Sequence, residues 1–366
     1  MAVPAPFPKP VQTLKSDCPV SPEVWGELAA SADAEEAGTS PIRKSIDVLS
    51  AAGLLMDDGA HDPQRTARTL MKVGAANLSV GRLWEGHVNA LRLINLYGTF
   101  QQKGTVRDQI ANGALLGVWG ADGAEPVTWA PPDEHINGSK NFASGLGTVS
   151  YVVVTVNSGP AVRLALIDVS NVDRADASKW KMHGMKATAS GTFDFTNLPT
   201  GAFDWIGAPG DYLKEPNFVG DVWRIAALQV GATVGLIDRA AARLRDMERM
   251  QAEQQKVRLG TVLMRAWAGM ALVERAALAT ANRDLPAEQI VSMSISSRLF
   301  TEEVGLAAIT AVEQSLGLQH FAQGSQTGRM ARDLSVYLRQ AARDAFVQRA
   351  AEFALGQEGK SWGVFE

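Results

Sequence analysis

The middle of the chain contains two short runs rich in β-branched residues, YVVVTV at residues 151–156 and RLALIDV at residues 163–169. Turn-forming residues bound both runs, which is typical of β-strands. Residues 192–196, TFDFT, alternate polar and apolar side chains as a half-buried strand does. A further apolar run at residues 115–119 ends in a glycine-rich turn. These patterns predict a small β domain in the middle of the chain.

The segments on both sides of this region have helical patterns. Ser21-Pro22 and Asp62-Pro63 each place a capping side chain before a proline, which is a common helix start. Apolar positions between Val80 and Ile94 recur at spacings of three and four, and His87 lies on the same face. After Tyr212 the helical period returns and persists to about Leu355. The sequence therefore predicts helices, then strands, then helices.

These changes of pattern divide the chain into three parts. We expect an N-terminal helical domain at residues 1–112, a β domain at residues 113–211 and a helical bundle at residues 212–366. The predicted fold class is α+β, because the strands are segregated from the helices rather than alternating with them.

Composition limits the function. The net charge is −4 and no basic stripe stands out, so we expect no nucleic-acid partner. Cys18 is the single cysteine and the five histidines are scattered, so we expect neither a disulfide nor a metal site. The N-terminus lacks the apolar core of a signal peptide, and the most apolar later run, residues 225–237, is too short to span a bilayer. We expect a cytoplasmic protein without a membrane segment.

Four segments, in this order, resemble those of the acyl-CoA dehydrogenases and the related flavin-dependent monooxygenases. They are Ala52–Leu55, Ile136–Gly145, Gly184–Pro199 and Arg332-Asp333. The resemblance covers nearly the whole chain and implies that family's fold: a helical domain, a small β-barrel or sandwich, and a C-terminal four-helix bundle. It also implies a flavin cofactor, FAD with FMN as the alternative, and a homodimer or homotetramer.

The resemblance assigns roles to residues of the β domain. Phe142 would flank the flavin ring, and the Ser144 hydroxyl would lie near flavin N5, where it stabilises charge as a hydride arrives. Trp119, Gly120 and Ala121 match the flavin-facing end of a strand, where Ala121 replaces the family's hydroxyl residue. The alternative is that Phe142 and Trp119 pack in the core while Ser144 caps a turn.

Departures from the family pattern leave the reaction open. The two positions of the family's catalytic glutamate fall near Ala341 and Arg245, so ordinary acyl-CoA dehydrogenation lacks its base. The family's arginine clamp for the FAD pyrophosphate is also missing, although Lys256 or Arg258 could replace it. His87 matches a histidine that the monooxygenases place near the flavin, and the alternative is a hydrogen-bonded core histidine.

Three hypotheses follow. The leading one is a flavoprotein oxidoreductase that acts on a small molecule, an acyl thioester among the candidates, without the usual glutamate. The second is a two-component flavin-dependent monooxygenase that uses His87. The third is a non-catalytic scaffold or binding protein that keeps the fold.

Overall fold

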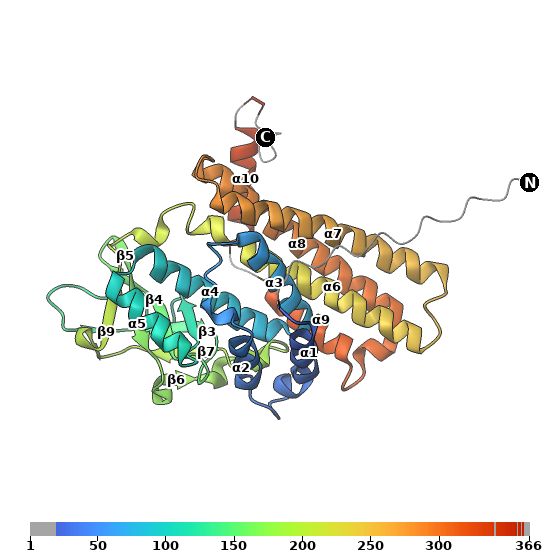
Figure 1. The fold of residues 1–366 in the computed structure, drawn as a ribbon, viewed down its shortest axis with the longest axis horizontal. Coiled ribbons are helices and arrows are strands. Elements are labelled where there is room, and N and C mark those ends of the chain that lie inside the picture. The colour runs from blue at the N-terminus through green and yellow to red at the C-terminus, as the bar shows by residue number, and fades with distance from the viewer. Residues whose placement is uncertain (1–19, 340–341, 357, 360, 362–366) are drawn as a thin grey trace, which may run out of the picture.

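The computed structural model describes residues 20–339, 342–356, 358–359 and 361. Figure 1 shows the strands gathered at one end of the molecule, with helix α5 (Phe100–Ala111) beside them, and the long helices α6 (Trp223–Asp246), α7 (Glu253–Ala281) and α8 (Ala287–Leu316) at the other end. Cys18 and Ala341, both named above, lie outside the described residues.

The N-terminal part is helical, as predicted. Ser21 Oγ accepts the Glu23 N–H at 3.3 Å, and Asp62 Oδ1 accepts the Arg65 N–H at 2.9 Å, so both predicted helix starts are capped. The helices are α1 (Pro22–Glu36), α2 (Arg43–Ala51), α3 (Pro63–Ala76), α4 (Leu78–Tyr97) and α5 (Phe100–Ala111), with the short helix η1 (Leu54–Met56) between α2 and α3.

The β domain consists of three small sheets. The largest has the order β1-β4-β5-β9, with β1 parallel to β4 and the other pairs antiparallel. A second has the order β3-β7-β6, and β2 pairs with β8. The strands are β1 (Leu116–Trp119), β2 (His135–Ile136), β3 (Ser139–Ala143), β4 (Tyr151–Ser158), β5 (Ala161–Asp168), β6 (Ala175–Asp176), β7 (Gly191–Asp194), β8 (Leu198–Pro199) and β9 (Phe203–Ile206).

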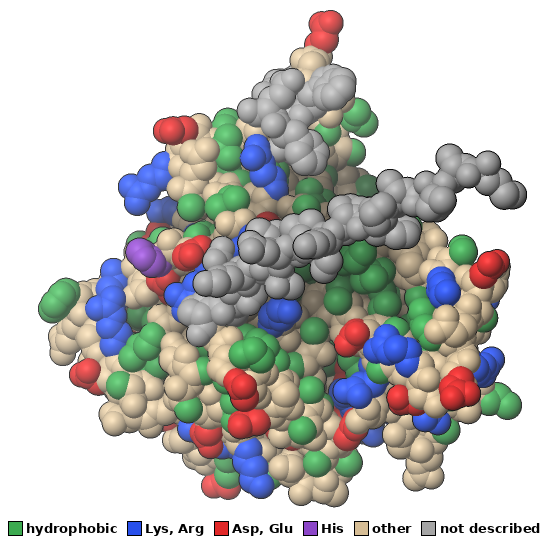
Figure 2. All heavy atoms as spheres, turned by 45° about the vertical axis from the view of Figure 1, so that its right-hand side comes forward, with side chains coloured by type: hydrophobic (Ala, Val, Ile, Leu, Met, Phe, Trp, Pro, Cys, Tyr) green, Lys and Arg blue, Asp and Glu red, His purple; other side chains and the backbone are tan. Residues whose placement is uncertain are grey.

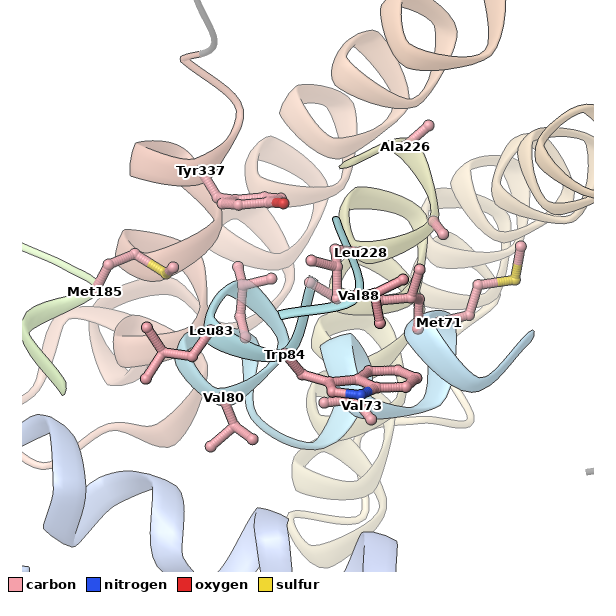
Figure 3. Packing of buried hydrophobic residues seen from close by; sticks show 14 of the residues in the cluster. Met71, Val73, Val80, Leu83, Trp84, Val88, Met185, Ala226, Leu228 and Tyr337 are labelled. Atoms are coloured by element: carbon pink, nitrogen blue, oxygen red, sulfur yellow. The ribbon is translucent and has the colours of Figure 1, made fainter. Parts of the chain in front are cut away.

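The C-terminal part packs as a bundle that α3 joins. Its helices are α6 (Trp223–Asp246), α7 (Glu253–Ala281), α8 (Ala287–Leu316), α9 (Gln326–Tyr337) and α10 (Arg343–Leu355). Helices α3 and α6 approach closely at Gly231, where an added Cβ would lie 2.1 Å from the Met71 carbonyl oxygen. Figure 3 shows Met71, Leu228 and Trp84 in the core formed where α3, α4 and α6 meet.

One segment, Val219–Asp246, is long and apolar enough to cross a membrane by length and composition alone. Because 61% of its most apolar window is buried inside the protein, we interpret it as a core helix.

On the face in Figure 2, acidic and basic side chains are interspersed over the surface.

The predicted α+β fold, with a small sheet domain between helical parts, is confirmed. Helix α5 ends at Ala111 and α6 begins at Trp223, with short strands and turns between them. The domain boundaries after residues 112 and 211 stay predictions.

Candidate functional site

An aromatic side chain projects from the β domain at the end of β3. Phe142 is 59% exposed, so it does not pack in the core. Its ring meets the Trp180 ring edge-on, with the centroids 6.4 Å apart. The backbone of Phe142 has φ of 54°, a left-handed conformation that is costly for a bulky residue. The fold therefore holds this ring in the solvent under strain.

Beside Phe142, three hydroxyl groups form a line that ends at Ser144. The Thr188 and Ser190 hydroxyls are 2.8 Å apart, and Ser190 Oγ donates to Ser144 Oγ at 3.0 Å. Thr188 Oγ1 donates its one proton to the Met185 carbonyl oxygen at 2.7 Å, so only the Ser190 proton is shared between Thr188 and Ser144. When Ser190 donates to Ser144, the Ser144 proton has only a long contact of 3.4 Å, to the Phe142 carbonyl oxygen. Ser144 can thus donate a well-directed hydrogen bond to a ligand.

The segment opposite Ser144 is strained as well. Met185 and Ala189 flank the short helix η4 (Lys186–Thr188) and have φ of 57° and 43°. Gly145 and Leu146 donate backbone hydrogen bonds to Thr188 and Ala189, which ties this segment to the one that carries Phe142. Left-handed non-glycine residues in neighbouring segments, here Phe142, Met185 and Ala189, are typical of functional sites.

The bundle holds the strained segment in place. Asp333 on α9 is buried and accepts the Met185 N–H at 2.7 Å through Oδ1. Burial raises the pKa of Asp333, while Arg329 counters that shift through an ion pair of 3.0 Å. Two of the segments that carried the family resemblance, Gly184–Pro199 and Arg332-Asp333, are therefore in direct contact.

Trp119 supports the site from the core of the β domain. It is 3% exposed and packs against Phe193, with the ring centroids 5.3 Å apart. Its Nε1–H donates to the Ser144 carbonyl oxygen at 3.1 Å. Trp119 is thus a core residue that fixes the loop carrying Ser144.

Gly120 and Ala121 follow Trp119 and lie exposed at the end of β1. The Ala121 carbonyl oxygen accepts the Asn141 N–H at 2.9 Å, which leaves the outer side of this turn open to a ligand.

A buried lysine fixes the same turn. Its structural role was not predicted from the sequence. Lys140 is fully buried, and its ammonium donates to Asp122 Oδ1 at 2.5 Å and to Thr155 Oγ1 at 2.8 Å. The Gly120 carbonyl oxygen lies 3.5 Å from the same nitrogen. Burial lowers the pKa of Lys140, and the bonds to Asp122 oppose that shift. Lys140 is quoted in the resemblance, but only the fold shows that it points inward.

His87 lies away from this surface. It is fully buried on α4, its Nε2 lies 2.6 Å from the Leu55 carbonyl oxygen, and its Nδ1 accepts the Leu116 N–H at 2.9 Å. Burial lowers the pKa of His87 to about 4. The ring is therefore neutral at neutral pH, as the tautomer that carries its proton on Nε2. Both nitrogens are engaged by the backbone, which favours the core-histidine interpretation over the catalytic one.

A pocket lined by basic and acidic side chains opens next to the strained segment. It has a volume of about 430 Å³, and its charged lining includes Lys186, Arg332 and Glu36, together with the paired Arg329 and Asp33. Within the described part of the chain, neither Lys186 nor Arg332 has an ion-pair partner. Trp180 Nε1 donates to the Gly184 carbonyl oxygen at 3.2 Å, so the pocket begins a few residues from the aromatic pair. No sequence pattern indicates this pocket, because its residues come from distant segments.

The other predicted positions add no chemistry. Arg245 lies exposed near the end of α6, and Arg258 donates to the Gln255 side chain at 3.0 Å. Across the described residues, no group of three histidine, cysteine or acidic side chains could hold a metal ion.

Comparison with solved structures decides the fold family. TdsC from Paenibacillus sp. A11-2, solved with FMN and indole, superposes with a TM-score of 0.78 over 91% of this chain and 95% of its own, at 17% identity. The HsaA monooxygenase from M. tuberculosis gives a TM-score of 0.74 over 91% of this chain and 97% of its own, at 15% identity. The chain has the acyl-CoA dehydrogenase fold. The family resemblance read from the sequence is thereby confirmed at the level of the fold.

Sequence comparison with curated proteins covers a smaller part of the chain than the structural comparison does. The dibenzothiophene monooxygenase of Rhodococcus erythropolis is 26% identical over 213 residues, which are 52% of this chain and 50% of that protein. The match thus spans about half the length of this curated relative. KijD3, solved with FMN and a dTDP-linked amino sugar, shares the fold with a TM-score of 0.75 over 95% of this chain and 98% of its own, at 15% identity. No family model matches the chain.

Proposed function

We propose that the protein is a flavin-dependent monooxygenase of the two-component type. The observation that carries the proposal is Phe142, a strained and exposed ring beside Ser144, whose own proton makes only a long contact of 3.4 Å. A reduced flavin, supplied by a separate reductase, would provide oxygen transfer from O₂ to a small molecule, the second oxygen atom leaving as water. The monooxygenases among the similar proteins support this reaction over dehydrogenation.

The residues present fit a flavin. Phe142 and Trp180 offer aromatic faces for the isoalloxazine ring, and Ser144 would donate a hydrogen bond to it. The turn at Gly120 and Ala121 has no side chain that would obstruct a flat ring. His183, Lys186 and Arg332 would hold a phosphate group.

FMN fits better than the FAD expected from the sequence. Lys186 and Arg332, which have no ion-pair partner among the described residues, offer a site for one phosphate group, and the clamp for a pyrophosphate is missing from the sequence. TdsC and KijD3 were both solved with FMN.

The chain's own residues would bind and orient rather than abstract a proton. Arg245 stands where the family places one of its carboxylate bases, and oxygen transfer does not need that base. The His87 Nε2–H donates to the Leu55 carbonyl oxygen, so we leave His87 out of the chemistry.

The proposal covers the assembly and the substrate too. We propose a homodimer or homotetramer that binds a small-molecule substrate. Light scattering tests the assembly, and a monomer would contradict it. If a thioester were the substrate, butyryl-CoA would be oxidised with an artificial electron acceptor, and we expect no turnover.

The decisive experiment titrates the purified protein with FMN and FAD and follows quenching of flavin fluorescence. We expect saturable binding with FMN preferred. Indole and dibenzothiophene then serve as probes, with a flavin reductase and NADH, and we expect an oxygenated product from at least one. Failure to bind either flavin would sink the proposal and leave the scaffold hypothesis.

A further inference from the structure

The interior between the β domain and the bundle contains several charged residues. They are the arginines Arg92, Arg224 and Arg298 and the carboxylates Glu85, Asp221 and Glu302, and the partly exposed Arg82 borders them. Both Arg224 and Arg298 are at least 98% buried.

Two of the carboxylates pair with three of the arginines. Glu85 pairs with Arg82 at 3.0 Å and with Arg224 at 3.3 Å. Asp221, at the end of the short helix η7 (Val219–Asp221), pairs with Arg92 at 2.6 Å and with Arg224 at 3.1 Å. These contacts form an open chain from Arg82 to Arg92, so each of these arginines has an acid within ion-pair distance.

Arg298 on α8 is different. It is 1% exposed, and none of its three side-chain nitrogens has a hydrogen-bond partner in the part of the chain that the structure describes. Its nearest acid is Glu302, whose Oε2 lies 4.0 Å away and has no hydrogen-bond partner among the described residues either, while its Oε1 accepts from Arg343 at 3.2 Å. A buried guanidinium with unmet donors is strongly unfavourable unless a further partner satisfies it.

Two tyrosines connect Arg298 to the candidate flavin site. Tyr337 on α9 is buried within electrostatic reach of Glu85, Arg224 and Arg298, and Figure 3 shows its hydroxyl turned away from Met185. Tyr212 lies near Glu85 and Arg224, and its hydroxyl oxygen is 3.6 Å from the position of a Cβ built on Gly120. Burial raises the pKa of both phenols, so both are neutral at neutral pH.

Helix α10 covers Arg298 without joining the main core. The Phe346 ring lies 5.1 Å from the Arg298 guanidinium carbon, and α10 has no buried residue of its own. Its apolar contacts belong to a small separate group around Val291 and Ile295. Arg349 adds ion pairs to Glu215 at 2.9 Å and to Glu288 at 2.6 Å. A cover attached in this way can open to admit a ligand.

We propose that Arg298 binds the carboxylate of a substrate whose apolar body points toward the flavin site. The guanidinium offers a planar fork that matches a carboxylate, and the Phe346 ring beside it favours an apolar or aromatic body. The ligand's carboxylate supplies hydrogen-bond acceptors for the three Arg298 nitrogens that Glu302, at 4.0 Å, leaves without a partner. Its role as substrate rests on the proposed function, whereas the binding of a carboxylate does not.

Calorimetry with naphthalene-2-carboxylate and its neutral carboxamide tests this site at neutral pH. We expect wild-type protein to bind the carboxylate at least tenfold more tightly than the carboxamide. In Arg298→Met this preference disappears, while Arg275→Met, which removes an exposed arginine on α7, retains it. Equal affinity of wild-type protein for the two compounds would overturn the proposal.

Two further measurements separate the possible failures. Arg298→Met removes a buried, unsatisfied charge, so we expect it to melt no lower than wild type. The FMN affinity of Arg298→Met should equal that of wild type. A carboxylate preference without FMN binding would leave this site standing while the proposed function fails, and FMN binding without the preference would refute this site alone.

Discussion

His87 and the Phe142–Ser144 segment both match positions that face the flavin in related proteins, yet the fold treats them in opposite ways. His87 is fully buried, and backbone groups of Leu55 and Leu116 occupy both of its nitrogens. Phe142 is 59% exposed on a strained backbone, and Ser144 retains a proton to donate. The comparison teaches that a reactive residue type indicates chemistry only where the fold leaves its polar atoms free to bond to a ligand.

The largest effect should come from the buried support of the exposed surface. Lys140→Met leaves Asp122 and Thr155 without their shared donor, and we expect a loss of about 3 kcal/mol in unfolding free energy. Urea unfolding measures it. Lys186→Met is the control, because that side chain is exposed and unpaired, and it should stay within about 0.5 kcal/mol of wild type. Equal stability of both variants would show that Lys140 does not hold the turn.

The next effect tests His87 as a structural residue. Its pKa is lowered from 6.5 to about 4 in the folded protein, so below pH 6.5 the unfolded chain binds a proton that the folded chain does not. Stability contributed by the neutral ring is present above pH 6.5 and is lost as the pH falls toward 4. We expect the unfolding free energy to drop by about 2 kcal/mol between pH 7 and pH 5 from this group.

Comparing the pH dependence of the unfolding free energy in wild type and in His87→Gln separates the contribution of His87 from that of other groups. Burial raises the pKa values of Glu35 and Asp57, which stabilises the folded state in acid and opposes the effect of His87. Urea unfolding at both pH values should show a steeper loss in wild type than in His87→Gln. Parallel pH dependence in the two proteins would mean that His87 titrates normally and is free for chemistry.

The sequence predicts what is local and misses what distant segments bring together. The caps at Ser21 and Asp62 and the strand patterns depend on residues a few positions apart, and the structure has them. The partners of His87 lie 32 and 29 residues away, and no periodicity reports them. The same holds for Lys186 and Arg332, which share a pocket although they belong to different domains of the predicted division. Phe142 and Ser144 were found only through the family resemblance, because a left-handed phenylalanine has no sequence signature.

Phe142 should affect flavin binding without supporting the fold. In Phe142→Gly, relief of the left-handed strain, worth ~1 kcal/mol, offsets the greater freedom of the unfolded chain, so the unfolding free energy should not fall. Loss of the ring should weaken FMN binding about tenfold, equal to about 1.4 kcal/mol. Phe193→Ala is the matched control, since this buried aromatic should cost stability of about 3 kcal/mol or more. A destabilised Phe142→Gly with unchanged FMN affinity would reverse the interpretation of this residue.

The smallest effect concerns the hydroxyl line. Ser144→Ala removes one neutral hydrogen bond to the flavin, worth ~0.5–1.5 kcal/mol, so the FMN affinity should fall several-fold. Ser190→Ala leaves the Ser144 hydroxyl in place but removes the group that donates to it at 3.0 Å, so its effect should be smaller. Ser178→Ala, whose hydroxyl bonds only to Asp176 among the contacts of the described residues, should have none. Fluorescence titration with FMN ranks the three variants, and melting temperatures without flavin verify that each remains folded. If Ser190→Ala costs more affinity than Ser144→Ala, the line runs in the other direction and Ser190 is the residue that meets the ligand.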